Sequence, residues 1–489
     1  MAKKLMIQGT MSGVGKSILT AGLLRVFKQD GYRVAPFKSQ NMALNSFVTK
    51  DGKEIGRAQA LQAAAAGVEP SSDMNPILLK PMGDTTSQVI VNGLPMANMR
   101  AKDYFAKKKS FIPDIVSAFD RLSEKSDIIV IEGAGSPVEI NLRQNDIVNM
   151  GLAEILDAPV LLAGDIDPGG VFAQLLGTVN LMPEDEKKRV KGLIINKFRG
   201  DVTLLEPGLS MFKKYCDIPF AGIVPYVKLS LDEEDSVSKR LVTGKKIENS
   251  EETVNIAVIR LPFISNYTDF TIFENIEGVN LYYVEDAESL DRADLIILPG
   301  TKNTLSDLKW LREKRIDDKI TCLAKKDVPI IGICGGFQML GRSISDPDGQ
   351  EAGGKEKGLS LLPVDTVFCT YKNLRQVSAF VPDLEGMYES LSQIQIRGYE
   401  IHMGESTGCG DAECVTTNDS VLGTYIHGIF DSPEFTARLL KILYDKKGIK
   451  REIPKIESAE VTREKELDKL ADVLRQSLDL EMIYSIMQG

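Results

Sequence analysis

The stretch "KLMIQGTMSGVGKSILT", from Lys4 to Thr20, decides the fold of the first part of the chain. A short apolar run ends in glycine, a glycine-rich turn follows, and a helix-like segment begins at the lysine of "GKS". This order of strand, loop and helix is the setting of a phosphate-binding loop, in which backbone N–H groups and the lysine contact phosphate while the hydroxyl can ligate Mg²⁺. Thr10 stands where the motif usually has its first glycine. The predicted nucleotide-binding residues of this loop are Thr10, Gly13, Gly15, Lys16 and Ser17.

Two further segments refine the nucleotide site. Glu132 ends the apolar run "DIIVIEG", where a carboxylate can hold Mg²⁺ together with Ser17. The segment "INKFRGD" places Asn196 like the asparagine of a guanine-reading motif, but Arg199 stands in place of that motif's aspartate. A partition-type ATPase would carry a lysine at Met11, which this chain does not. We therefore expect ATP rather than GTP as the nucleotide, with Mg²⁺ as its metal.

Apolar runs alternate with helix-like segments up to about residue 228. The runs "RVAPFK", "APVLLAGD" and "VKGLIINK" are continuous and end in Gly or a charged residue, which is typical of strands buried on both faces. Between the strands, Lys16–Gln29 and the alanine-rich "GRAQALQAAAAG" are typical of helices. Strands that alternate with helices predict an α/β fold with a doubly wound, mainly parallel sheet.

This alternation stops once and then resumes. Residues 231–253 are rich in charge and predict a solvated linker. A second series, with "VNIAVIRL", "ADLIILPG" and "SVLGTYIHGIF", predicts another doubly wound, mainly parallel domain over residues 254–450. Residues 451–489 form an amphipathic helical tail, which we expect to pack on its own domain rather than recruit a partner. The predicted division is therefore 1–230, 231–253, 254–450 and 451–489.

The run "VPIIGICGGFQMLG" places Cys334 on a glycine-flanked bend between a strand and a helix. Such a nucleophile elbow exposes the side chain while the next backbone N–H points at the oxyanion. We expect the N–H of Gly335, with one from the "LPGTKNT" turn near Gly300, to form the oxyanion hole. A thiol also needs a base to form thiolate near neutral pH. The chain has 2 histidines, so His427 in "GTYIHGIF" is the candidate base and His402 in "RGYEIHMG" its rival.

Composition excludes several classes of protein. The 489 residues carry a net charge of −10 and no long Lys/Arg block, so we expect no nucleic-acid partner. No window approaches the ~18 apolar residues of a membrane span. The 6 cysteines form no CxxC pair and are typical of reduced thiols. We expect a cytoplasmic enzyme with no membrane contact and no obligate protein partner.

The second domain resembles the class I glutamine amidotransferases. The resemblance rests on "GICGGFQMLG" and "GTYIHGIF". It implies that Cys334 attacks the carboxamide of L-glutamine, forms a glutamyl thioester and releases ammonia. Members of that family usually have a glutamate two residues after the histidine, whereas Gly428 and Ile429 follow His427 here. In this departure the chain resembles the cobyric acid synthase branch of the family, which implies a cysteine–histidine pair without that glutamate. What orients His427 is left open.

Nearly the whole chain resembles the cobyric acid synthases. The stretches "KSQNMALNS", "EGAGSPVEINL", "GGVFAQLLGT" and "LPFISNYTDF" carry this resemblance, because they are long, polar and without periodicity. The first domain is also similar to dethiobiotin synthetase, which implies that Lys38 faces the γ-phosphate or an acyl phosphate and that Asp51 lies near the metal. Pro168 stands where the resemblance implies an arginine, so another cation would be needed there.

The resemblance implies an ATP- and glutamine-dependent amidation in cobalamin biosynthesis. The expected substrate is (adenosyl)cobyrinic acid a,c-diamide, whose b, d, e and g carboxylates become amides to give (adenosyl)cobyric acid. ATP would activate each carboxylate as an acyl phosphate, which ammonia from glutamine would attack. The alternatives are a cobyrinic acid a,c-diamide synthase, a nucleotide-switched scaffold with an inactive glutaminase domain, and an enzyme that amidates cell-wall lipid precursors.

Overall fold

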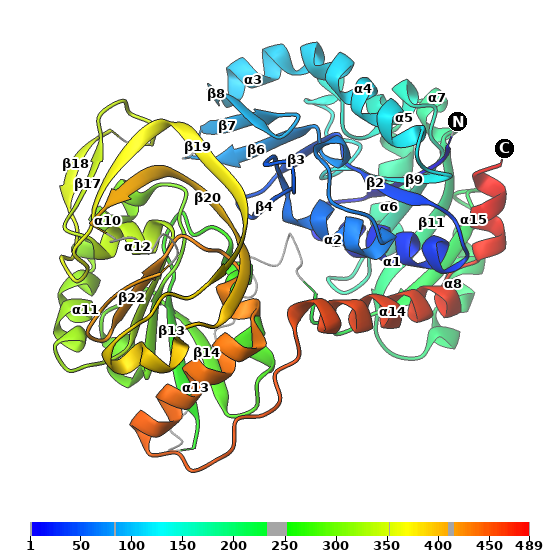
Figure 1. Ribbon diagram of the computed structural model, residues 1–489. Helices are drawn as coiled ribbons and strands as arrows, with labels where there is room; N and C mark the ends of the chain where they lie inside the picture. The colour runs from blue at the N-terminus through cyan, green and yellow to red at the C-terminus, as the bar shows by residue number, and fades with distance from the viewer. Residues whose placement is uncertain (1, 83–84, 232–251, 352, 409–414, 489) are drawn as a thin grey trace.

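The computed structural model describes residues 2–82, 85–231, 252–351, 353–408 and 415–488. The chain forms two lobes, each built on a largely parallel sheet that carries helices (Figure 1). The predicted linker, 231–253, falls almost wholly outside the described residues.

The main sheet of the first lobe has the order β12-β11-β10-β1-β9-β2, and its neighbouring strands are parallel. Its strands are β1 (Lys3–Gly9), β2 (Val34–Phe37), β9 (Ile128–Glu132), β10 (Val160–Asp165), β11 (Val190–Phe198) and β12 (Phe220–Pro225). Its helices are α1 (Lys16–Gln29), α2 (Arg57–Ala66), α3 (Ala101–Lys107), α4 (Ile112–Ser123), α5 (Met150–Ile155), α6 (Val171–Leu181), α7 (Glu184–Lys187) and α8 (Glu206–Phe212). The predicted doubly wound sheet is confirmed, and α1 spans the residues expected for it.

Apolar side chains cover both faces of this sheet. Along β1, Leu5 and Ile7 belong to the apolar cluster that contains α1, whereas Met6 belongs to the cluster that contains Ile115 of α4. Successive side chains of a strand point to opposite faces, so a sheet buried on both sides needs unbroken apolar runs. This is why the sequence shows such runs instead of alternation.

A second, smaller sheet was not foreseen from the sequence and adjoins the other lobe (Figure 1). It has the order β3-β6-β7-β8, and a separate hairpin, β4-β5, stands beside it. The strands are β3 (Gln40–Met42), β4 (Ser46–Val48), β5 (Glu54–Gly56), β6 (Ile77–Pro81), β7 (Thr86–Val91) and β8 (Leu94–Arg100). The Tyr399 hydroxyl of the second lobe donates a hydrogen bond to the Ser46 carbonyl oxygen of this hairpin at 3.2 Å. The hairpin is thus part of the contact between the lobes.

The main sheet of the second lobe has the order β14-β13-β15-β16-β22-β21, parallel except for β21 at the edge. Its strands are β13 (Val254–Ile259), β14 (Val279–Val284), β15 (Leu295–Leu298), β16 (Ile330–Ile333), β21 (Thr416–Asn418) and β22 (Val421–Thr424). Its helices are α10 (Thr304–Glu313), α11 (Ile316–Ala324), α12 (Gly335–Leu340) and α13 (Pro433–Lys447). A second sheet consists of β17 (Ser343–Asp346), β18 (Gly354–Lys357), β19 (Asp365–Phe380) and β20 (Gln395–Thr407). The second predicted parallel-sheet domain is therefore also confirmed.

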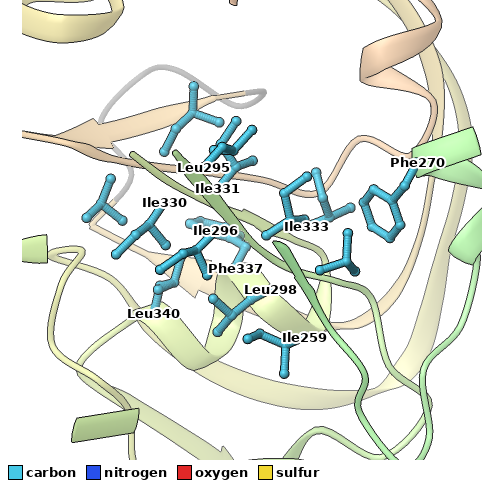
Figure 2. Close-up of a cluster of buried hydrophobic side chains, with 14 of the residues drawn as sticks. Ile259, Phe270, Leu295, Ile296, Leu298, Ile330, Ile331, Ile333, Phe337 and Leu340 are labelled. Atoms are coloured by element: carbon cyan, nitrogen blue, oxygen red, sulfur yellow. The ribbon is translucent and has the colours of Figure 1, made fainter. Parts of the chain in front are cut away.

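The core of the second lobe supports the turn that carries Cys334. Phe337 and Leu340 of α12 lie in one buried cluster with Leu298 of β15 and Ile330 of β16 (Figure 2). Burying a large apolar side chain contributes about 1.5–3 kcal/mol. The short helix is therefore anchored by its apolar face, which fixes the position of the turn before it.

The C-terminal tail contains α14 (Ala459–Ser477) and α15 (Leu480–Ile486) and packs on the first lobe (Figure 1). Leu474 of α14 lies very close to Gly22 of α1. A Cβ added at Gly22 would lie only 2.4 Å from Leu474 Cδ1. The buried Arg25 of α1 pairs with Glu464 at 2.5 Å and with Asp468 at 3.2 Å. The helices of the tail therefore pack on the first lobe and not on the second domain, which directly precedes them in the sequence. The expectation that the helical tail packs on its own domain is wrong in this respect.

Candidate active sites

The phosphate loop connects β1 with α1 in the first lobe. Gly13 and Gly15 have φ angles of 75° and 95°, a region that favours glycine. At Gly15 a Cβ would also lie 2.4 Å from Asn196 Nδ2, so this position requires glycine twice over. Lys16 is buried, and its Nζ donates to the carbonyl oxygens of Met11 and Gly135 at 3.1 Å each. The ammonium group is thus held between the loop and the segment after β9.

Glu132 is the centre of a buried cluster beside this loop. Its Oε1 accepts hydrogen bonds from Ser17 Oγ at 2.7 Å and from Lys38 Nζ at 3.0 Å, and its Oε2 accepts one from Gln62 Nε2 at 2.5 Å. Burial by itself raises the pKa of Glu132, but the Lys38 charge and these hydrogen bonds outweigh burial and lower the pKa. The carboxylate therefore stays ionised, and its contact with the Ser17 hydroxyl fits the oxygen ligands that Mg²⁺ prefers.

Asp51 lies apart from this cluster. On the turn between β4 and β5, its carboxylate accepts a hydrogen bond from Thr49 Oγ1 at 2.5 Å and pairs with Lys53 Nζ at 3.1 Å. Within the described ranges, no contact joins Asp51 to the Glu132 cluster. The structure thus brings Ser17, Lys38 and Glu132 together, and it leaves the expected third metal residue on the hairpin.

The end of β11 lies against the same loop. Asn196 Nδ2 donates to the Val14 carbonyl oxygen at 2.7 Å. Lys197, which the sequence did not single out, donates to the Gly13 carbonyl oxygen and pairs with Asp165 at 2.7 Å. Lys197 is thus a second cation beside the loop, in the region where Pro168 replaces an expected arginine.

The loop opens into a cavity of about 970 Å³, within the size range of ligand pockets. One wall carries Arg199, whose guanidinium carbon lies 3.6 Å from the centroid of the Tyr226 ring. The lining also includes Thr268 and Thr271 of the second lobe and Arg463 of the tail. The cavity is thus formed by both lobes and by the tail, although its phosphate end belongs to the first lobe alone.

The second site is the turn between β16 and α12. Cys334 has φ 49° and ψ −107°, a strained conformation for a residue with a side chain. Its N–H donates to the Thr424 carbonyl oxygen of β22 at 2.8 Å. A Cβ on Gly336 would lie 2.0 Å from the Leu298 carbonyl oxygen, so only glycine permits this close approach. The predicted sharp turn between a strand and a helix is present, and long-range contacts hold its strain. The role of Cys334 as the nucleophile stays a prediction.

His427 follows β22 and is buried, with a side chain 1% exposed. Its Nδ1 lies 2.7 Å from Asp269 Oδ2, and Asp269 Oδ1 accepts the Gly428 N–H at 3.1 Å. Burial alone lowers the pKa of His427, but its interactions with Asp269 and Cys334 outweigh burial and raise the pKa to about 10. Asp269 therefore supplies the carboxylate that orients the imidazole of His427, although no glutamate stands two residues after this histidine.

Asp269 was missed from the sequence, because it lies 158 residues before His427. It belongs to the 3₁₀ helix Tyr267–Asn275, within the "ISNYTDF" stretch that follows β13. Asn266 precedes this helix and places its Nδ2 3.3 Å from His427 Nε2. Its Oδ1 accepts the Ser46 N–H of the first lobe at 3.1 Å. Asn266 thus links the hairpin of one lobe to the imidazole of the other.

The two predicted oxyanion glycines, Gly300 and Gly335, lie close to residues around Cys334. A Cβ on Gly300 would be 2.9 Å from His427 Cε1, and one on Gly335 would be 2.6 Å from Thr301 Cγ2. The "LPGT" turn therefore contacts both the histidine and the residue after the cysteine. That the N–H groups of these two glycines form an oxyanion hole stays a prediction.

His402, the rival base, is also close. It lines the same small cavity as Cys334, but its Nδ1 lies 2.8 Å from the Gly404 carbonyl oxygen and its ring stacks on Tyr425 at 3.8 Å between centroids. The carboxylate nearest to it, Glu400, is 3.5 Å from its Nε2 and also binds Arg375 at 2.8 Å. The contact between the imidazole and a carboxylate is therefore closer at His427, at 2.7 Å, than at His402.

Two ionisable side chains of opposite kind line the same small cavity as the cysteine. Lys302 and Glu351 both contribute to it, together with the amide side chain of Gln338. Burial is the main cause of the raised pKa of Glu351, about 7, although Lys302 opposes it. The cavity thus offers a cation, a carboxyl group and an amide within reach of one thiol.

Comparison with known proteins assigns a different family model to each of the two lobes. Residues 5–237 match the family model of the CobQ/CobB/MinD/ParA nucleotide binding domain, and residues 255–435 match that of the CobB/CobQ-like glutamine amidotransferase domain. Within the described ranges, the structure has no helix with the length and apolar character that a membrane span needs.

Full-length relatives cover the chain from end to end. Cobyric acid synthases of Lachnoclostridium phytofermentans, Ruminiclostridium cellulolyticum and Clostridium acetobutylicum are 52%, 50% and 50% identical to it. The alignments cover 100%, 100% and 99% of this chain and 99%, 98% and 98% of those proteins. The chain, with its phosphate loop in one lobe and its cysteine elbow in the other, therefore belongs to the cobyric acid synthase family and is a glutamine-dependent amidoligase of cobalamin biosynthesis.

Proposed function

We propose that this enzyme converts (adenosyl)cobyrinic acid a,c-diamide into (adenosyl)cobyric acid by amidating the b, d, e and g carboxylates. The observation that carries the proposal is the presence, in one chain, of a complete phosphate loop with Glu132 and Lys38 and of a cysteine elbow with His427 and Asp269. Neither site by itself explains the other. An amidation that needs both an activated carboxylate and a source of ammonia explains both.

Glutamine hydrolysis is the task of the second lobe. The Cys334 thiolate attacks the carboxamide carbon of L-glutamine, and backbone N–H groups near Gly335 and Gly300 stabilise the oxyanion. The protonated His427 gives its Nε2 proton to the leaving nitrogen, which departs as NH₃ and leaves a glutamyl thioester. Water then releases glutamate. The raised pKa of His427 supports this acid role, because it keeps the imidazole protonated near neutral pH.

Lys302 and Glu351 are the groups that we assign to glutamine itself. Lys302 is buried, and its ammonium group suits the α-carboxylate of the amino acid, while Glu351 suits the α-ammonium group. Charge-assisted hydrogen bonds of this kind are roughly twice as strong as neutral ones. They would hold the carboxamide end of the substrate at Cys334.

Carboxylate activation is the task of the first lobe. Backbone N–H groups of the phosphate loop and Lys16 bind the phosphates of ATP. Lys38, which is held by its hydrogen bond to Glu132, faces the γ-phosphate that is transferred. Ser17 and Glu132 would hold Mg²⁺, which supplies charge neutralisation at the phosphates when bound. The corrinoid carboxylate takes the γ-phosphate to become an acyl phosphate. Ammonia then displaces phosphate and forms the amide.

The test is an incubation of the enzyme with ATP, Mg²⁺, L-glutamine and the a,c-diamide, followed by mass spectrometry. Four amide gains per corrinoid support the proposal. Amidation of cobyrinic acid at two positions, with no further gain on the a,c-diamide, would instead identify an a,c-diamide synthase. Absence of glutamate release would indicate a scaffold with an inactive glutaminase, and amidation of a lipid-linked cell-wall precursor in place of the corrinoid would identify the remaining alternative.

A further inference from the structure

A buried carboxyl group lies behind the turn that follows β15. It belongs to Asp307, which is in the first turn of α10 and is 0% exposed. The Thr301 hydroxyl donates a hydrogen bond to Asp307 Oδ2, and the Phe263 N–H donates to the same oxygen at 3.3 Å. Asp307 thus joins the turn after β15 to the segment after β13, which also carries Asp269.

This carboxyl group is costly to bury. Burial raises the pKa of Asp307 to about 7, although the hydrogen bonds from Thr301 and Phe263 lower it. Among the residues that the structure describes, no lysine, arginine or histidine pairs with Asp307. A buried carboxyl group without a cation stabilises a fold less than an apolar side chain of similar size does. Asp307 therefore needs a reason beyond stability, and its contacts point to Thr301.

The hydroxyl group of Thr301 is held on several sides. Thr301 Oγ1 lies 3.1 Å from the Phe263 carbonyl oxygen and accepts the Asn303 N–H at 3.1 Å. An ionised Asp307 accepts the hydroxyl proton of Thr301. A protonated Asp307 instead donates to Thr301 Oγ1 and leaves the hydroxyl proton for the Phe263 carbonyl oxygen. Asp307 can therefore hold Thr301 in either protonation state.

The backbone of Thr301 faces away from the segment after β13. Thr301 and Ile264 form an isolated antiparallel bridge. The hydrogen bonds of this bridge are made by the neighbouring residues, from the Ser265 N–H to the Gly300 carbonyl oxygen at 2.9 Å and from the Lys302 N–H to the Phe263 carbonyl oxygen at 3.0 Å. In a pair of this type, the N–H groups of the two facing residues point away from the partner segment. The Thr301 N–H therefore points to the other side of the turn.

Gly335, the residue after Cys334, lies close to Thr301. A Cβ added at Gly335 would lie 2.6 Å from Thr301 Cγ2 and 3.2 Å from Thr301 N. Thr301 is 8% exposed and Gly335 is buried, yet among the described residues neither backbone N–H has a hydrogen-bond acceptor. Buried backbone N–H groups are normally paired. Two unpaired N–H groups next to one thiol are suited to an anionic oxygen that forms there.

We propose that Asp307 is a positioning residue of the glutaminase, which fixes the Thr301 hydroxyl so that the Thr301 N–H and the Gly335 N–H together face the oxyanion formed at Cys334. The inference rests on the proposed function, and it moves the second donor from Gly300 to the next residue of the turn. Gly300 then has a different purpose. A Cβ there would lie 2.9 Å from His427 Cε1, so the absence of a side chain makes room for the imidazole.

The kinetics of glutamate release by the full-length enzyme, with ATP, Mg²⁺ and the a,c-diamide present, test this inference. Thr301→Val keeps the shape and the backbone N–H but removes the hydroxyl, and Asp307→Ala removes the carboxyl group that holds it. In both variants we expect kcat to fall about 10- to 100-fold, which is part of the effect of losing an oxyanion donor outright. The KM for glutamine should stay within about 3-fold, because the interaction is made in the transition state. Thr301→Ser keeps the hydroxyl and should restore most of kcat.

Asp294→Ala is the matched control. Asp294 precedes β15 at the opposite edge of the sheet, where it accepts the Asn255 N–H at 2.7 Å and pairs with Lys447 at 2.6 Å. This variant should keep the wild-type kcat even if its thermal stability falls. Amidation from ammonium salts should stay at the wild-type rate in all four variants.

Thermal unfolding shows which variants are folded, and the comparison of Thr301→Val with Thr301→Ser carries the test if Asp307→Ala does not fold. Folded variants with the wild-type kcat would overturn the inference. A loss that lies in KM, or one that Thr301→Ser does not restore, would overturn it as well, because the role of these residues would then be structural. A wild-type enzyme that releases no glutamate from glutamine would instead refute the proposed function, on which the inference rests.

Discussion

Asp269→Asn should remove most of the glutaminase activity and leave the synthetase intact. The substitution keeps the shape of the side chain and permits the hydrogen bond from Gly428, but it removes the charge that faces His427 Nδ1 at 2.7 Å. Burial, which lowers the pKa of His427, then acts without that compensation, and the pKa falls from about 10 toward or below the ordinary value of 6.5. The protonated imidazole is no longer the resting form at neutral pH.

The size of the effect follows from the same shift. The difference between 6.5 and about 10 for His427 corresponds, at ~1.4 kcal/mol per pKa unit, to stabilisation of the imidazolium by about 5 kcal/mol, shared by Asp269 and Cys334. Loss of most of this in the step that protonates the leaving nitrogen should lower kcat for glutamine hydrolysis on the order of 10² to 10⁴-fold.

Two measurements check this prediction. Glutamate release reports the glutaminase, and amidation of the corrinoid from ammonium salts at mildly alkaline pH reports the synthetase, which should stay near the wild-type rate. Because the pKa of His427 is raised in the folded protein, its stabilising contribution is complete below about pH 6.5 and is lost as the pH rises through about 10. The difference in unfolding free energy between wild type and variant should therefore shrink from pH 6 to pH 10.

Asp286→Asn is the matched control, since Asp286 is an exposed residue of the same lobe that binds only Ser289 among its described contacts. Glutamine hydrolysis by Asp269→Asn within a few-fold of this control, with an unshifted pH profile, would refute the reasoning. So would an equal loss of ammonia-supported synthesis, because that would make Asp269 a structural residue of the whole enzyme.

The remaining predictions concern the two sites and the tail. Lys16→Ala should abolish amidation with glutamine and with ammonia alike, and survival of ammonia-supported synthesis would contradict the phosphate-loop assignment. Cys334→Ser should lose nearly all glutamine-dependent product while it still uses ammonium salts, because a hydroxyl is a far poorer nucleophile than a thiolate. His427→Ala should behave like the cysteine variant, whereas glutamate release by His402→Ala should be much less affected; the reverse order would move the base to His402. Leu474→Ala should destabilise the first lobe by about 2–5 kcal/mol, measured by denaturant unfolding, and an unchanged midpoint would contradict the packing of the tail on α1.

Several features could be predicted from the sequence because they depend on neighbours along the chain. Continuous apolar runs that alternate with helical segments were enough for both parallel sheets. The glycines at positions 13 and 15 and the "GKS" that follows were enough for the phosphate loop, since a strand, a left-handed turn and a helix are local structures. The bend at Cys334 was recognised in the same way. In each case the chemistry is carried by residues within one turn of each other.

Other features were decided by tertiary structure alone. Asp269 reaches His427 only because β13 and β22 end at the same edge of the sheet, so that the segments following them meet. The two residues are 158 positions apart, and no spacing in the sequence reveals their contact. Asp51 lies on the turn of the β4-β5 hairpin, where it pairs with Lys53, and not beside the strand that carries Glu132. Glu54 finds Lys372, 318 residues away, at a contact between lobes that no local pattern encodes. Periodicity and motifs report what a residue's neighbours in sequence require, whereas these contacts depend on which strand ends and lobe surfaces meet when the whole chain packs.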